Sequence, residues 1–343
     1  MSGDAPWLPA PSMPSFPSAQ THARAEEEYR MSRLPVTLTA GVGEAAVRHG
    51  VFDPALKQFD DAFRPGDGVV EDPGLRARWQ TARRSALDLV LAAVAGSPWA
   101  DSLVLRGSML MSAWFGPAAR APKDIDFVVV PDTWGIEDAR TDAMLDGIAE
   151  AAERLAAERG TGLALSASEA VSERIWTYER VPGRRLVIPW TAPGLPGGQV
   201  QIDFVFQEPL PTPPRRTEVA GVRVLAADRE LSLAWKLMWL ACDLYPAVKD
   251  LYDAVLLAEH SALRLPLLET VMRTADEWPG NRDEPLGLPV FETAAREVDW
   301  NTDLDAEAGR SEGIAPAPEV LAARQALADR LVTALAPLFE DGS

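Results

Sequence analysis

The chain has 343 residues, of which 47% are hydrophobic and 24% charged, and its formal net charge is −18. Such proportions are those of a folded protein long enough for about two domains. The acidic balance argues against a protein that coats nucleic acid by neutralising phosphates. The single cysteine, Cys242, excludes an intramolecular disulfide and fits a cytoplasmic location, and with only three histidines a structural zinc site is not expected. No apolar run reaches the ~18 residues of a membrane helix, so we expect no membrane association.

The N-terminal part of the chain has little periodic pattern. Residues 1–18 contain five prolines among serines and alanines, which cannot build regular structure, so we expect residues 1–20 to be a disordered leader. Residues 21–70 show no clear period. We expect two further divisions of the chain, an N-terminal segment and core over residues 21–212 and a mainly helical domain over residues 213–343.

Beyond residue 73 the hydrophobic pattern sharpens, and it predicts the following elements in chain order. Helices are expected at residues 74–96, 108–114, 137–159, 228–244, 248–260, 266–275 and 318–338. Strands are expected at residues 103–105, 125–130, 173–178, 185–190, 199–206 and 222–225, with a turn at 193–198 and a proline-rich hinge at 209–214. The sequence therefore predicts an α+β core with a mixed sheet, followed by a helical C-terminal half.

The segment from Leu105 to Phe127 carries the strongest chemical signal. A strand leads into Gly107 and Ser108, a helix follows, and the chain returns as a strand with Asp124 and Asp126. Side chains two apart on a strand share a face, so these two carboxylates point the same way. Two such anions repel unless a cation offsets them, and oxygen ligands suit Mg²⁺ or Mn²⁺. Gly107 would let the backbone approach a triphosphate, and Ser108 would offer a hydroxyl and an N–H at a helix start.

A third carboxylate is expected from the strand V-Q-I-D-F-V-F at residues 200–206. Its apolar side chains alternate with Gln201 and Asp203, so Asp203 lies on the polar face. If this strand pairs beside the Asp124 strand, three carboxylates converge and are enough for two metal ions, as in-line phosphoryl displacement uses. Considered singly, each of these features is also typical of an ordinary turn or strand end; their order along the chain favours a functional site.

A second cluster lies in the C-terminal half. Lys236 is the only charge between Leu231 and Cys242. A lysine in so apolar a helix needs an anion, and phosphate is the natural partner; the alternative is a side chain that reaches solvent along its alkyl stem. In K-D-L-Y-D, Lys249 and Asp253 are four residues apart, the spacing of either a surface ion pair or a catalytic pair.

Taken in order, the motifs resemble the AbiEii/AbiGii-type nucleotidyltransferases, toxins of abortive-infection and toxin–antitoxin systems. The matching residues span about 75–260 and are G-S at 107–108, Arg120, D-I-D-F at 124–127, Q-I-D-F at 201–204, L-A-W-K-L at 233–237 and K-D-L-Y-D at 249–253. The resemblance implies a polymerase-β-like nucleotidyltransferase core within residues 21–212, Mg²⁺ at Asp124 and Asp126, a phosphate contact at Lys236, and roles for Lys249 and Asp253 near the transferred group.

On this hypothesis the chain transfers NMP from an NTP to an acceptor hydroxyl on tRNA or protein, with an antitoxin as a partner. Asp203 would bind a second metal or take the acceptor's proton, and Asp253 would be a second base or would orient the acceptor. Nucleotide contacts are expected from Gly107, Ser108, Arg120, Lys236 and Lys249. A basic rim, or simply solvated faces, is expected from Arg83, Arg84, Arg184, Arg185, Arg215 and Arg216.

Three other functions fit parts of the pattern. A small-molecule nucleotidyltransferase of the antibiotic-modifying kind would share the metal site and would suit the acidic charge. A non-catalytic, partner-binding relative would have no need of intact Asp124, Asp126, Asp203 and Lys236. A D-x-D glycosyltransferase would leave the Gly-Ser turn and the Lys236 helix unexplained.

Overall fold

The computed structural model of the chain describes residues 46–47, 69–70, 72–177, 181–243, 246, 248–275, 286–298 and 318–340. The chain divides into two units, Met1–Pro35 and Val36–Ser343, and every described residue belongs to the second unit. The leader expected at residues 1–20 therefore lies outside the described residues. The division expected between residues 212 and 213 stays a prediction.

The first long helix, α2 (Pro73–Ala95), begins and ends where its sequence predicts. The Asp72 side chain accepts a hydrogen bond of 2.6 Å from the backbone N–H of Leu75, and Pro73 occupies the first helical position. Gly96 follows the last turn. A second long helix, α4 (Ala139–Arg159), starts two residues later than expected and ends at Gly160, whose φ of 59° is the left-handed conformation that closes many helices.

Within the described residues, eight strands form one mixed sheet in the order β5-β7-β8-β4-β3-β10-β9, with β6 pairing β7 outside this path. The pairs β4–β8 and β3–β10 are parallel and the others antiparallel. The strands are β3 (Leu103–Arg106), β4 (Ile125–Val129), β5 (Ala164–Leu165), β6 (Val171–Thr177), β7 (Val181–Thr191), β8 (Gly198–Val205), β9 (Arg215–Val219) and β10 (Val222–Ala226). Short strands β1 (Ala46–Val47) and β2 (Val69–Val70) pair with each other.

Two strands of this sheet were missed by the sequence pattern. The prediction at residues 209–214 was a hinge, and β9 begins directly after it. The segment R-R-T-E-V has almost no apolar alternation, so its strand character comes from pairing with β10 across a tight turn at Ala220 and Gly221, both of which have positive φ. The two-residue strand β5 was missed for its length.

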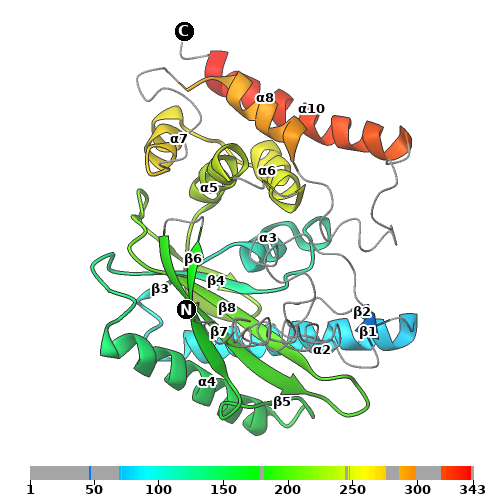
Figure 1. Ribbon diagram of the computed structural model, residues 1–343, viewed down its shortest axis with the longest axis vertical. Coiled ribbons are helices and arrows are strands. Elements are labelled where there is room, and N and C mark those ends of the chain that lie inside the picture. Colours follow the sequence, from blue (N-terminus) through cyan, green and yellow to red (C-terminus); the bar gives the residue numbers. More distant parts are fainter. Residues whose placement is uncertain are drawn as a thin grey trace, which may run out of the picture. The chain divides into compact units, whose positions relative to one another are not determined.

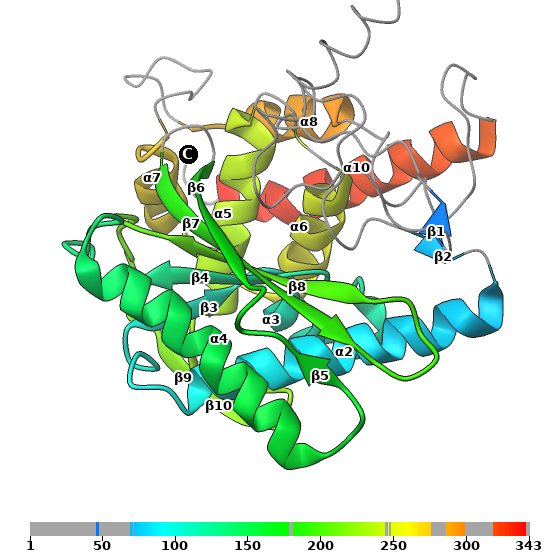
Figure 2. The same ribbon diagram turned by 60° about the horizontal axis from the view of Figure 1, so that its bottom comes forward.

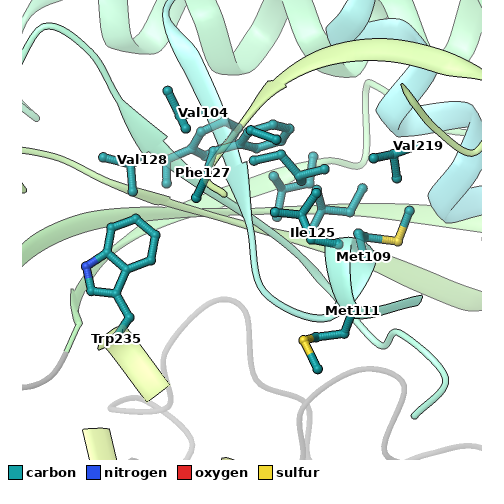
Figure 3. Packing of buried hydrophobic residues seen from close by; sticks show 14 of the residues in the cluster. Val104, Met109, Met111, Ile125, Phe127, Val128, Val219 and Trp235 are labelled. Atoms are coloured by element: carbon teal, nitrogen blue, oxygen red, sulfur yellow. The ribbon is translucent and has the colours of Figure 1, made fainter. Parts of the chain in front are cut away.

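The hydrophobic core lies between the sheet and the helices that cover it (Figure 3). Ile125 pairs in register with Ile202, and the Phe127 and Phe204 rings stack with their centroids 5.8 Å apart. These side chains alternate with Asp126 and Asp203, as predicted, so the polar residues occupy the opposite face. Helix α2 packs against α4 and against β8 and β10, and Figure 2 shows the two helices running beneath the sheet.

Every element described after β10 is a helix: α5 (Arg229–Cys242), α6 (Val248–His260), α7 (Leu265–Met272), α8 (Leu288–Glu297) and α10 (Pro318–Glu340). Helix α5 packs on α6, α7 and α8, while α10 packs on α6 and α8 (Figure 1). Helix α8 was not expected, because its ten residues carry too short a periodic pattern. No helix within the described residues is long and apolar enough to cross a membrane.

Candidate active site

The turn between β3 and helix α3 (Ser108–Phe115) has a backbone conformation that requires glycine. Gly107 has φ 77° and ψ −149°, a region that residues with a side chain rarely enter. A Cβ atom placed there would also collide with the carboxylate of Asp126. Glycine therefore serves two needs, since it makes the turn and leaves room for Asp126 against the backbone at the start of α3.

Asp126 is the second residue of β4, the strand next to that turn, and Asp124 directly precedes the strand. The Ser108 hydroxyl donates to Asp124 Oδ1 at 3.2 Å and lies 3.3 Å from its backbone carbonyl oxygen. The start of α3, where backbone N–H groups lack helical partners, is thereby fixed beside both carboxylates. The structure brings together four residues that the sequence placed in one site, Gly107, Ser108, Asp124 and Asp126.

The carboxyl of Asp126 is held in an environment that disfavours its charge. Burial, followed by the negative charges of Asp124 and Asp203, raises the pKa of Asp126 to about 7. The charges of Arg106 and Lys236 act in the opposite direction but do not outweigh the burial and the neighbouring carboxylates. A buried carboxylate cluster of this kind gains stability from a bound cation.

Four charged side chains form a row across four adjacent strands. Strand pairing places Arg185 opposite Asp203, Asp203 beside Asp126, and Asp126 opposite Arg106. The two aspartates at the centre of the row are therefore flanked by an arginine on each side. Arg106 is buried, and its Nη1 lies 2.6 Å from Glu208 Oε2. Its guanidinium also lies over the rings of Trp235 and Trp239, at 5.3 and 5.4 Å from their centroids.

The position of Asp203 beside Asp126 agrees with the predicted strand pairing, but its carboxylate is already engaged. Arg185 donates to both oxygens, with Nε 2.8 Å from Oδ1 and Nη2 2.7 Å from Oδ2, and Gln201 Nε2 lies 3.2 Å from Oδ2. Over the part of the chain that the structure describes, no group of three or more Asp, Glu, His or Cys side chains is arranged to hold a metal ion. Strand pairing places Asp203 beside Asp126, and metal binding by all three carboxylates stays a prediction.

The interpretation of Arg185 as part of a solvated or basic rim is wrong, because its side chain is only 9% exposed. Four other arginines of the expected rim contact groups of the protein itself. Arg83 donates to the Lys123 carbonyl, and three more form ion pairs: Arg84 with Asp88, Arg184 with Asp142, and Arg216 with Asp101.

Lys236 is buried in α5, as its apolar surroundings predicted, and it meets anions of the protein itself. Its Nζ lies 2.6 Å from Asp250 Oδ1 and 3.2 Å from Asp253 Oδ2, both on α6, and 4.6 Å from the centroid of the Trp239 ring. Burial opposes the charge of Lys236, but Asp250 and Asp253 outweigh it and raise the pKa of the lysine. The alternative in which Lys236 reaches solvent is wrong.

Asp253 is fully buried and joins the core to the C-terminal helices. Arg120, which precedes β4, donates from Nε to Oδ1 at 3.1 Å and from Nη2 to Oδ2 at 2.7 Å. Nearby, the Tyr252 hydroxyl donates to the carbonyl of Ala118 at 2.8 Å. The Asp253 carboxylate thus pairs with both Arg120 and Lys236, and its role as a second base or in orienting the acceptor stays a prediction. Its expected pairing with Lys249 is not what the structure shows, although the Lys249 charge helps to lower the pKa of Asp250.

Sequence reasoning missed three contributors to this site. Asp250 stands in K-D-L-Y-D, but its pairing with Lys236 depends on how α5 packs against α6. Arg106 ends a strand that otherwise consists of Leu and Val, and this buried charge was the available signal. Glu208 follows β8 in the chain, and only the tertiary fold brings it to Arg106.

A helix start with a serine hydroxyl, set against a carboxylate pair, defines a class of site suited to a phosphate group held together with a cation. The family comparison agrees with this class. A family model described as the nucleotidyl transferase AbiEii toxin of type IV toxin–antitoxin systems matches residues 89–329. The match covers more than half of the chain, so the chain belongs to the AbiEii family. No individually curated protein matches it.

Proposed function

We propose that this protein is a metal-dependent nucleotidyltransferase with a polymerase-β-like core, which transfers NMP from an NTP to an acceptor hydroxyl. The observation that carries the proposal is the junction of β3 and α3 against β4. There the Asp126 carboxylate occupies the space that a side chain at position 107 would need, and Ser108 holds Asp124. Family membership supports the same reaction class.

Asp124 and Asp126 are the residues that would hold Mg²⁺ or Mn²⁺. Their donors are carboxylate oxygens, which these hard cations prefer. The raised pKa of Asp126 fits this assignment, because the nearby cations of the protein leave its charge incompletely offset. When bound, the metal supplies Lewis-acid stabilisation of charge on the phosphate oxygens.

The remaining chemistry comes from the protein's own groups. The backbone N–H groups that open α3 and the Ser108 hydroxyl would bind the nucleotide phosphates, because the positive end of a helix favours anions. Arg106 and Lys236 favour the ionised form of Asp126 through their charges, which keeps it available as a ligand. Asp250 holds the Lys236 ammonium and Asp253 holds the Arg120 guanidinium, so both positive charges have fixed positions near the carboxylate pair.

For the acceptor we propose a tRNA or protein hydroxyl, with an antitoxin as the protein's partner. The description of the family as toxins of type IV toxin–antitoxin systems supports the antitoxin. The acceptor is proposed from the resemblance of the motifs to these nucleotidyltransferases. The net charge of −18 predicts that an RNA acceptor, if used, binds at a local basic surface and with strong salt dependence.

The test is incubation of the protein with each of the four α-³²P-labelled NTPs, with Mg²⁺ or EDTA, and with tRNA, protein or aminoglycoside acceptors. Transfer of label that requires Mg²⁺ and disappears in Asp126→Asn supports the proposal. Transfer that persists in EDTA refutes metal dependence. Failure to label any acceptor, with no nucleotide binding, refutes the reaction class. Label on the aminoglycoside alone selects a small-molecule acceptor.

A further inference from the structure

The second strand with a carboxylate, β8, contributes Asp203 to the polar face of the sheet. Unlike Asp124 and Asp126, Asp203 forms a close ion pair with an arginine. Both Asp203 oxygens receive hydrogen bonds from Arg185 in the fork geometry that an arginine and a carboxylate form most strongly. Gln201 adds a third donor. An Asp203 oxygen that bound a metal ion while keeping this pairing would hold the ion next to the guanidinium of Arg185, and two cations so close repel each other where the Arg185 side chain is only 9% exposed.

Strand register explains why this pairing is built into the fold. Arg185 is the direct cross-strand partner of Asp203 on β7, and Asp203 is the neighbour of Asp126 on β4. Along the row from Arg185 to Arg106 two positive charges flank two negative ones. Glu208 pairs with Arg106 on one side, as Arg185 pairs with Asp203 on the other. Asp203 and Glu208 are each held by an arginine at hydrogen-bonding distance, whereas Arg106 and Lys236 act on Asp126 through their charges and do not outweigh its burial and its neighbouring carboxylates.

We propose that Asp203 is the anchor of Arg185 and not a metal ligand, so that Asp124 and Asp126 hold a single metal ion. Arg185 is then a positioning residue, a fixed cation beside the aspartate pair at the place where a third carboxylate would otherwise recruit a second ion. This inference rests on the proposed function, because it concerns the same metal site. It predicts a different number of ions and a different ligand set from a three-carboxylate site.

The experiment measures Mn²⁺ binding by the loss of the free-ion electron paramagnetic resonance signal. It is done with Mn²⁺ alone and then with a non-hydrolysable NTP analogue. The wild-type protein is expected to bind one Mn²⁺ in either case. Two ions per protein in the presence of the analogue, with the second lost in Asp203→Asn, would overturn the inference. This measurement needs only the wild-type protein and one isosteric variant.

A charge-neutral double variant, Arg185→Gln with Asp203→Asn, tests the ligand set without changing the net charge of the site. Its matched control is Arg106→Gln with Glu208→Gln, which removes the ion pair on the other side of Asp126. Both double variants are expected to weaken Mn²⁺ binding, because both ion pairs lie beside Asp126, but their affinities are expected to stay within about tenfold of each other because neither pair supplies a ligand. An affinity at least about tenfold weaker for Arg185→Gln/Asp203→Asn than for its control overturns the inference. Thermal unfolding of both verifies that they fold.

The single variant Arg185→Gln gives a readout that a purely structural role would not change. It releases the Asp203 carboxylate beside Asp126, so a second Mn²⁺ site is expected to appear. If the stoichiometry stays at one although the variant folds, Arg185 does not exclude a second ion and its proposed role is refuted. If the wild-type protein binds no Mn²⁺ with or without nucleotide, the metal-dependent function itself fails, whatever the role of Asp203.

Discussion

Replacement of Lys236 by methionine tests the buried ion network between α5 and α6. Methionine retains most of the lysine's bulk, so the main change is loss of the positive charge that pairs with both Asp250 and Asp253. Removing one partner of a buried ion pair costs about 3–5 kcal/mol. Asp253 keeps its bidentate bond from Arg120, so we expect the lower end, about 3 kcal/mol of unfolding free energy.

The pH dependence of this loss has a definite sign. In the wild-type protein Lys236, with Lys249, lowers the pKa of Asp250 despite its burial, so this carboxylate stabilises the fold above pH 3.8 and its contribution is lost as the pH falls through the lowered pKa. Without Lys236, burial, which is already the largest single influence on Asp250, is opposed only by the charges of Lys249 and Arg120, and we expect the pKa of Asp250 to rise. A group with a raised pKa in the folded state favours folding as the pH falls. The destabilisation by Lys236→Met is therefore expected to be smaller at pH 5 than at pH 8.

Thermal unfolding followed by circular dichroism at both pH values measures these effects. A loss of about 3 kcal/mol corresponds to a fall in Tm of about 4 °C at pH 8 for a chain of 343 residues. Lys249→Met is the matched control: this half-buried lysine lies on α6 and its charge lowers the pKa of Asp250 less than that of Lys236 does, so a change within about 0.5 kcal/mol is expected. A Lys236→Met protein as stable as wild type at pH 8, or one whose deficit grows toward pH 5, would refute the reasoning.

Three further changes address the carboxylate pair and its surroundings. Asp126→Asn is expected to lower turnover more than about a hundredfold while raising the Tm of the metal-free protein, because it removes a buried like charge; a lower Tm would contradict this. Gly107→Ala is expected to destabilise the fold by about 1–3 kcal/mol and to weaken NTP binding, measured by unfolding and calorimetry, and wild-type values for both would disprove the need for glycine. Arg106→Met leaves the buried Glu208 carboxylate without its partner, and it is expected to lower the unfolding free energy, measured with denaturant, by about 3–5 kcal/mol. The control Arg216→Met removes an exposed ion pair and is expected to change this free energy by less than about 0.5 kcal/mol. Equal effects of the two variants would count against the role of burial.

The sequence predicted the elements whose patterns are strong and local. Helix α2 has a capping aspartate, a proline at its first position and a terminal glycine, and all three signals act within a few residues of the helix ends. Alternation along residues 200–206 likewise predicted which side chains of β8 are buried. The strand β9 escaped prediction because it has almost no apolar alternation and depends on pairing with its neighbour β10, and the helix α8 because its short pattern depends on packing against α5 and α10.

For the site, the sequence alone predicted that Asp124 and Asp126 share a face and that a glycine–serine turn precedes them. It also predicted that Lys236, if buried, needs an anion. These follow from the period of a strand, the backbone freedom of glycine and the cost of a buried charge. Only the tertiary structure decided which opposite charges meet. It placed Arg185 on Asp203, and Asp250 and Asp253 on Lys236. Ion pairs between residues on different elements depend on strand register and helix packing, and neither is encoded in the spacing of residues along the chain.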